Sequence, residues 1–139
     1  MYRVSMLGLS CLAVCLFACS SDNVCKKGDT ECVCASQESC SWVCEGGGCS
    51  FNASNEGEAS FDCNDGGGCI VSNSSQGNVY VECSAGNCRV TTVGQGKTTV
   101  NCAGGGCTVD CNGQGTCEIT GCPDCVCTAG TITAECVVN

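Results

Sequence analysis

The segment Cys102-Ala-Gly-Gly-Gly-Cys107-Thr-Val-Asp-Cys-Asn-Gly-Gln-Gly-Thr-Cys-Glu-Ile-Thr120 decides the fold of this chain. Two cysteines bracket a triple glycine, a short alternating segment follows, and a Gly-Gln-Gly turn leads into a second alternating segment. Alternation with a period of two is typical of a β-strand that buries one of its faces. The segment therefore predicts two short strands joined by glycine-rich turns.

The same unit recurs along most of the chain. The first cysteine of each unit recurs every 19 or 20 residues, at Cys25, Cys44, Cys63, Cys83, Cys102 and Cys122. Two residues after the second cysteine of a pair, the units carry Phe51, Val71, Val90 and Val109. Self-similarity at a fixed period is the signature of a repeat architecture. We therefore expect one repeat domain over residues 25–139, with units that start near 25, 44, 63, 83, 102 and 122.

The repeat predicts an all-β, disulfide-rich fold, because no helix signal occurs after residue 24. Two strands per unit, at about 20 residues per coil, favour a β-solenoid (β-helix-like) in which like positions stack. One apolar ladder would then run through Trp42, Phe61, Val81, Val100, Ile119 and Val138, and a second through Phe51, Val71, Val90 and Val109. An antiparallel β-meander is the alternative, since hairpin loops also fit the cysteine spacings.

A glycine is shared by the second turn of four units, at Gly57, Gly77, Gly96 and Gly115. Glycine adopts a left-handed backbone conformation more cheaply than any other residue. We therefore expect these glycines to be left-handed.

The first residues predict export from the cytoplasm. An uncharged apolar run over residues 4–18 is too short to span a bilayer and suits the core of a signal peptide. The run ends in Leu16-Phe17-Ala18-Cys19-Ser20, which resembles the lipobox of bacterial lipoproteins. That resemblance implies a signal peptide over 1–18, lipidation (palmitate) of Cys19, a lipid-anchored tether over 19–24 and sorting to the outer membrane. Ordinary secretion is the alternative.

Cysteine is the most frequent residue, with 21 copies among 139 residues. Exported proteins meet an oxidising environment in which disulfides form. Cys11 and Cys15 would be lost with the signal peptide, and Cys19 would carry the lipid. This leaves 21 minus 3, or 18, cysteines, which can close nine bridges. Cysteines that flank a tight turn can approach the Cα separation of about 5.5 Å that a bridge needs. We expect the local pairs Cys25–Cys32, Cys34–Cys40, Cys44–Cys49, Cys63–Cys69, Cys83–Cys88, Cys102–Cys107, Cys111–Cys117, Cys122–Cys127 and Cys125–Cys136. Bridges between coils are the rival scheme.

The remaining side chains carry little chemistry. After the signal, four basic and 14 acidic residues give a formal charge of −10, which argues against a nucleic-acid partner. The chain has no histidine and no paired base, so we expect a non-enzymatic protein without a cofactor or metal. Cys122-Pro-Asp-Cys125 has the C-x-x-C spacing of redox and zinc sites, which keeps metal binding or thiol redox chemistry as the alternative.

As a whole, the chain resembles a loose group of cysteine- and glycine-rich bacterial lipoproteins of unknown function. The resemblance rests on the lipobox and on units such as Gly-Gly-Gly-Cys-Thr-Val-Asp-Cys at 104–111. It implies a disulfide-stapled β-solenoid that serves as a structural or interaction protein of the cell envelope. Its expected partners are the membrane, through the N-terminal lipid, and an unidentified protein at the cell surface.

Overall fold

The computed structural model describes residues 23–30, 32–122, 124–130 and 135–139. Within these ranges the chain forms thirteen β-strands, and no helix there is long and apolar enough to cross a membrane. The expected signal peptide over 1–18 and the expected lipidation site Cys19 lie outside the described residues.

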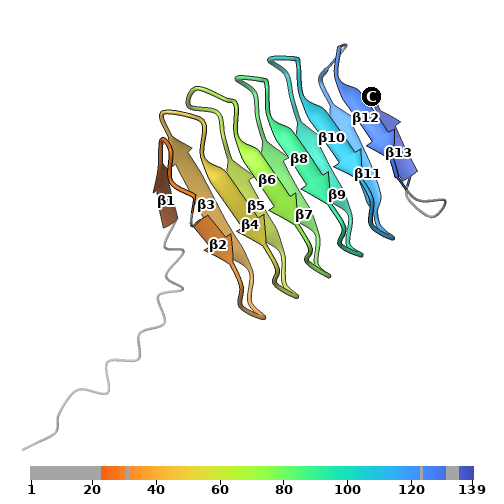
Figure 1. Cartoon of the computed structure of the whole chain (residues 1–139), viewed down its shortest axis with the longest axis horizontal. Coiled ribbons are helices and arrows are strands. Elements are labelled where there is room, and N and C mark those ends of the chain that lie inside the picture. Colours follow the sequence, from red (N-terminus) through yellow and green to blue (C-terminus); the bar gives the residue numbers. More distant parts are fainter. Residues whose placement is uncertain (1–22, 31, 123, 131–134) are drawn as a thin grey trace, which may run out of the picture.

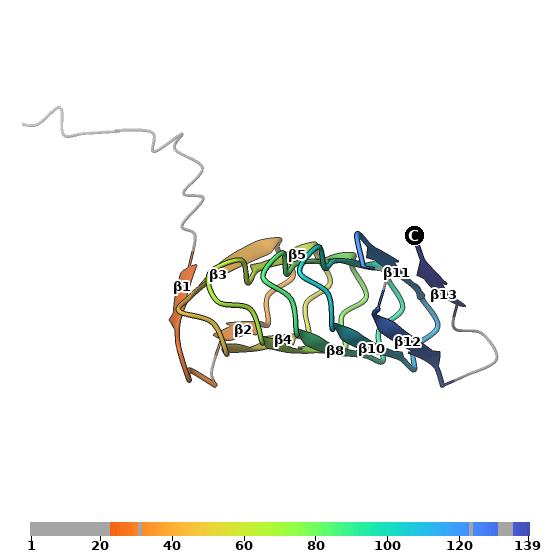
Figure 2. The same ribbon diagram turned by 90° about the horizontal axis from the view of Figure 1, so that it is seen from above.

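The strands form two sheets that face each other (Figures 1 and 2). The first sheet contains, in order, β1 (Asn23–Lys26), β3 (Cys40–Glu45), β5 (Ala59–Asp62), β7 (Val79–Glu82), β9 (Thr98–Asn101), β11 (Thr116–Thr120) and β13 (Glu135–Val138). The second contains, in order, β12 (Val126–Ala129), β10 (Thr108–Cys111), β8 (Arg89–Thr92), β6 (Ile70–Asn73), β4 (Ser50–Ala53) and β2 (Cys32–Cys34).

All neighbouring strands in both sheets run parallel. Paired residues lie 18 to 20 positions apart in the sequence, so each circuit of the chain is one coil of a β-solenoid. A meander would need antiparallel neighbours. The parallel register confirms the solenoid and excludes the meander.

Both expected apolar ladders are present in the core. In the first sheet, Phe61 pairs with Trp42 and with Val81, and the series continues in register to Val138. In the second sheet, Val71 pairs with Phe51 and with Val90, and the series continues to Val109. Most of these side chains are fully buried. Strands such as β5, β7, β8, β9 and β10 place alternate residues inward, so each of these coils adds a residue to each ladder.

The shared glycines of the second turn are not left-handed, so that expectation is wrong. Positive φ angles occur at other glycines, such as Gly67 and Gly105 in the cysteine-bracketed turns. A Cβ on Gly96 would instead overlap the carbonyl oxygen of Gly77 and lie 2.9 Å from that of Gln76. A Cβ on Gly77 would in turn overlap the carbonyl oxygen of Gly57. Glycine is required here because successive coils approach too closely for any side chain.

A buried polar cluster interrupts the apolar core beside this turn. Asn73 is 2% exposed, and its Nδ2 donates to the hydroxyl oxygens of Thr92 and Thr98, both at 3.0 Å. Its Oδ1 accepts from the backbone N–H of Ser75 at 2.8 Å and from the Ser75 hydroxyl at 2.6 Å. A buried polar group costs little only when it is fully hydrogen-bonded. The cluster therefore favours the register that brings Asn73, Thr92 and Thr98 together.

Candidate functional site: the stacked disulfide edge

The described residues contain nine disulfide bridges with Cα–Cα separations of 5.6 to 6.4 Å. All nine are local, and no bridge joins one coil to the next across the stack of like positions. Seven of them are pairs that we expect from the sequence: Cys25–Cys32, Cys34–Cys40, Cys44–Cys49, Cys63–Cys69, Cys83–Cys88, Cys102–Cys107 and Cys111–Cys117.

The last two bridges differ from the sequence expectation. The structure joins Cys122 to Cys125 and Cys127 to Cys136, in place of Cys122–Cys127 and Cys125–Cys136. The reason is register: Thr108 pairs with Val126, so Cys125 and not Cys127 stacks on Cys107. Cys127 moves two positions inward along the strand, where it pairs with Val109 in the register and bonds to Cys136 instead.

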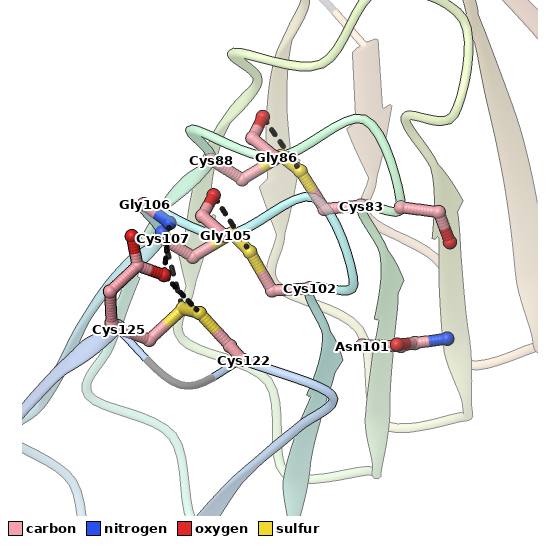
Figure 3. Close-up of a disulfide and its surroundings, with 12 residues drawn as sticks. Cys83, Gly86, Cys88, Asn101, Cys102, Gly105, Gly106, Cys107, Cys122 and Cys125 are labelled. Carbon is pink, nitrogen blue, oxygen red and sulfur yellow. Dashed lines mark hydrogen bonds between the residues drawn. A yellow bond between two sulfur atoms is a disulfide. The ribbon is translucent and has the colours of Figure 1, made fainter.

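The bridged turns stack along one edge of the solenoid, and Figure 3 shows three consecutive bridges there. Three sets of sulfur atoms lie within 4.8 Å of one another: Cys63, Cys69 and Cys88; Cys83, Cys88 and Cys107; and Cys102, Cys122 and Cys125. Each set spans two neighbouring bridges. Together the sets connect four bridges, Cys63–Cys69 to Cys122–Cys125, into a continuous row of sulfur that we call the sulfur ladder.

The sulfur ladder has the residue types of a metal site but not their chemical state. Metal binding to cysteine requires the thiolate form. Every sulfur in the three sets is part of a disulfide bridge and has no thiolate to offer. In the oxidised protein these sulfurs can pack and can undergo thiol–disulfide exchange.

The C-terminal bridge of the ladder differs from the others in its surroundings. Cys125 is half-buried, whereas the other seven ladder cysteines are at most 4% exposed. The backbone N–H of Cys107 donates to Cys125 Sγ at 3.2 Å (Figure 3). Asp124 Oδ1 lies 3.4 Å from Cys122 Sγ. Asp124 Oδ1 also accepts from the backbone N–H of Gly106 at 3.3 Å. The last bridge is thus the accessible end of the ladder and has a carboxylate beside it.

A hollow of about 470 Å³ lies at the N-terminal end, lined by Val24, Gly28, Asp29, Thr30, Cys32 and Trp42. Its carboxylate is already engaged, because Asp29 Oδ2 accepts from the backbone N–H of Lys26 at 2.8 Å. Trp42 Nε1 is buried without a hydrogen-bond partner in the described part of the chain. Among the described residues that line the hollow, Asp29 is the one with an acidic or basic side chain.

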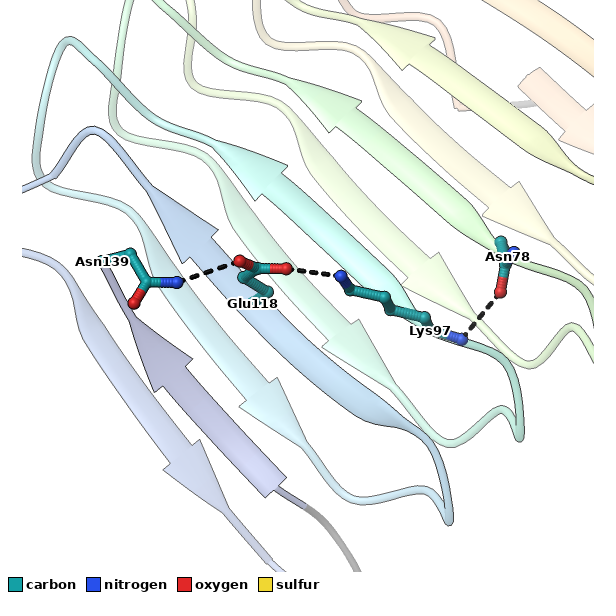
Figure 4. Close-up of polar contacts among 4 residues, drawn as sticks. All are labelled: Asn78, Lys97, Glu118 and Asn139. Carbon is teal, nitrogen blue, oxygen red and sulfur yellow. Dashed lines mark hydrogen bonds and ion pairs between the residues drawn. The ribbon is translucent and has the colours of Figure 1, made fainter.

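The outer face of the first sheet carries a chain of polar contacts from β9 to the C-terminus (Figure 4). The Lys97 ammonium forms an ion pair with Glu118, and Asn139 Nδ2 donates to Glu118 Oε1 at 2.9 Å. The hydrogen bond from Lys97 and its positive charge lower the pKa of Glu118. The same hydrogen bond and the negative charge of Glu118 raise the pKa of Lys97.

Replacing Lys97 with methionine is expected to raise the pKa of Glu118 toward its ordinary value near 4.5. Because the folded-state pKa of Glu118 is lowered, its contribution is present above pH 4.5 and lost as the pH falls through that lowered pKa. The raised pKa of Lys97 gives the opposite sign: its contribution is present below pH 10.5 and lost as the pH rises through the raised pKa.

NMR titration of the Glu118 carboxyl carbon measures the shift directly. The variant Lys27→Met removes a charge near the N-terminal end and should leave the titration of Glu118 unchanged. An unaltered Glu118 titration in Lys97→Met would show that the contact does not persist in solution.

No protein-family model matches this chain, and no curated protein and no solved structure matches it at a significant level.

Proposed function

We propose that this protein is a non-enzymatic structural protein of the bacterial cell envelope, anchored by lipid on Cys19 and built as a rigid rod. The observation that supports the proposal most strongly is a disulfide bridge in every coil of a continuous parallel solenoid. Each bridge restricts the unfolded chain, and each coil is held by its neighbours. Such a rod resists bending, proteolysis and local unfolding.

The proposed anchor also gives the rod an orientation. Only three residues separate Cys19 from Asn23, the first residue of β1, and that length of chain spans at most about 14 Å. Seven strands spaced about 4.8 Å apart make the first sheet about 29 Å long. The N-terminal coil would therefore lie close to the membrane, and the C-terminal coil would reach at most about 30 Å farther out.

The surface charge fits display in a crowded layer. A formal charge of −10 after the signal repels neighbouring copies and disfavours contact with anionic lipid headgroups. Outer-membrane sorting is proposed on the basis of Ser20, and an unidentified protein at the cell surface is the proposed partner.

Intact mass spectrometry of the unreduced protein, purified from membranes of a Gram-negative host, tests the proposal. The expected mass is that of residues 19–139 with three acyl chains and with nine bridges closed. The variant Cys19→Ala should lose the acyl chains and leave the membrane fraction with its bridges intact. A soluble, unacylated wild-type protein would overturn the anchor. Several free thiols or stoichiometric zinc would overturn the rod in favour of a metal-binding or redox protein.

A further inference from the structure

The sulfur ladder has one accessible end, and that end has the shortest loop of the nine bridges. Cys122 and Cys125 are three positions apart, whereas the other bridges span five to nine positions. Two further bridges, Cys34–Cys40 and Cys127–Cys136, also have a half-buried cysteine, but neither belongs to the three close sulfur sets. Among the bridges of the described residues, access from solvent and contact with another bridge coincide only at Cys122–Cys125.

We propose that Cys122–Cys125 is a thiol-exchange site for a low-molecular-weight thiol, and that the sulfur ladder carries the exchange into the core. The inference goes beyond the structural role proposed above and does not depend on the lipid anchor. It requires only the positions of the sulfur atoms and their unequal exposure.

The first step takes place at the exposed sulfur. The thiolate of the small molecule attacks Cys125 Sγ, a bond forms between the two sulfurs, and the Cys122–Cys125 bond breaks with its electron pair on Cys122. The products are a mixed disulfide on Cys125 and a thiolate on Cys122. Because Asp124 Oδ1 lies 3.4 Å from Cys122 Sγ, repulsion between like charges slows the release of the Cys122 thiolate and, once it has formed, favours its onward attack over its staying there.

The second step uses the neighbouring coil. Cys122 Sγ lies within 4.8 Å of Cys102 Sγ. Breaking the Cys122–Cys125 bond removes the covalent constraint on the Cys122 side chain. Its attack on Cys102 forms a Cys102–Cys122 bridge and releases Cys107 as the thiolate. The number of disulfide bonds is unchanged, so no oxidant or reductant is needed.

The same exchange can proceed through two more bridges. Cys107 Sγ lies within 4.8 Å of Cys83 Sγ, and attack of the Cys107 thiolate on Cys83 releases Cys88 as the thiolate. Cys88 in turn lies within 4.8 Å of both Cys63 and Cys69. Cys44–Cys49 belongs to none of the three close sets among the described residues, so the ladder ends at Cys63–Cys69.

The test on the wild-type full chain uses limiting reduced glutathione, an acid quench, alkylation in denaturant so that buried thiols react, and peptide mapping without reduction. Glutathione is expected on Cys125, a new bridge is expected between Cys102 and Cys122, and alkylation is expected on Cys107, Cys88 or the Cys63–Cys69 pair. Glutathione that adds first at Cys34–Cys40 or Cys127–Cys136 would overturn the assignment of the site. Alkylation confined to Cys122 would overturn the ladder.

A matched pair of variants tests the ladder without any added thiol. Cys125→Ser leaves Cys122 as a lone buried thiol next to Cys102, and Cys40→Ser leaves Cys34 as a lone buried thiol whose register neighbour is Ala53. In Cys125→Ser, the populations of the Cys102–Cys122 and Cys102–Cys107 bridges should differ by about tenfold or less, because exchange between similar disulfides is nearly balanced. In Cys40→Ser the thiol should stay on Cys34.

A thiol that stays on Cys122 in folded Cys125→Ser, as judged by circular dichroism, would refute the ladder. If that variant does not fold, the glutathione experiment on the wild-type chain decides the question by itself.

Discussion

Complete reduction of the nine disulfide bridges is expected to unfold the protein at room temperature, with loss of its β-sheet circular dichroism. In the chain-entropy model each bridge of this loop size contributes about 2 kcal/mol. Nine such contributions together exceed the 5–15 kcal/mol by which a typical domain is stable. The core that remains is small, because the largest fully buried side chains are Phe61, Ile119 and a series of valines.

Reduction by a phosphine followed by alkylation, with circular dichroism recorded before and after, measures this effect. The control is the oxidised protein treated with the alkylating agent alone, which should keep its spectrum. A reduced and alkylated chain that retains the spectrum would mean that coil stacking alone carries the fold, and the proposed role of the bridges would be wrong.

Gly96→Ala is expected to destabilise the solenoid by about 3 kcal/mol or more, although φ at this residue lies outside the left-handed range. The new methyl group would overlap the carbonyl oxygen of Gly77 in the preceding coil. That oxygen belongs to the backbone, so it cannot move away as the end of a flexible side chain could. The coils would have to separate locally, at the cost of hydrogen bonds such as that from Gln95 N–H to the Ser75 carbonyl oxygen at 3.1 Å.

The matched control is Gly68→Ala. Gly68 has a φ of +67°, but the space around its missing Cβ is open within 4 Å. Only the backbone penalty applies there, which is about 1–2 kcal/mol. Denaturant unfolding of the two oxidised variants separates the effects. If Gly68→Ala proved the more damaging, backbone conformation rather than close stacking would explain the shared glycines.

Most of the fold can be predicted from the sequence because the solenoid repeats one structural unit. Positions that stack in a parallel sheet face the same neighbours in every coil, so they select the same residue types. Val71, Val90 and Val109 share one register row and are spaced 19 residues apart. This recurrence identifies the inward face and the ladders without any knowledge of the turns.

Contacts between coils explain where the sequence misled. A glycine in a turn has two physical explanations, a left-handed backbone or a close neighbour, and only the path of the adjacent coil distinguishes them at Gly77. The bridges of the last coil depend on which cysteine continues the strand register, and the shortened turn between Cys122 and Cys125 conceals that register. The sequence shows the shared glycine and the altered cysteine spacing of the last coil, but it does not say which neighbouring atoms decide either one.

The buried cluster around Asn73 could not be predicted for a related reason. Asn73, Thr92 and Thr98 occupy inward positions at which other coils have alanine, valine or cysteine, and each residue read alone looks like a defect of the pattern. They compensate one another only after stacking brings their side chains to 3.0 Å. A single coil therefore carries too little information to account for them.

The short span of every bridge has a consequence for biogenesis. If the chain is exported as proposed, it leaves the translocation pore from its N-terminus onward, and its bridges join cysteines only three to nine positions apart. Each bridge can therefore close as soon as its own turn has emerged, while most later cysteines are still inside the pore. Because each new strand pairs in parallel with one 18 to 20 residues earlier, the coil already outside serves as the template for the next. Such a chain can assemble in the order in which it is secreted, with few competing cysteines exposed at any moment.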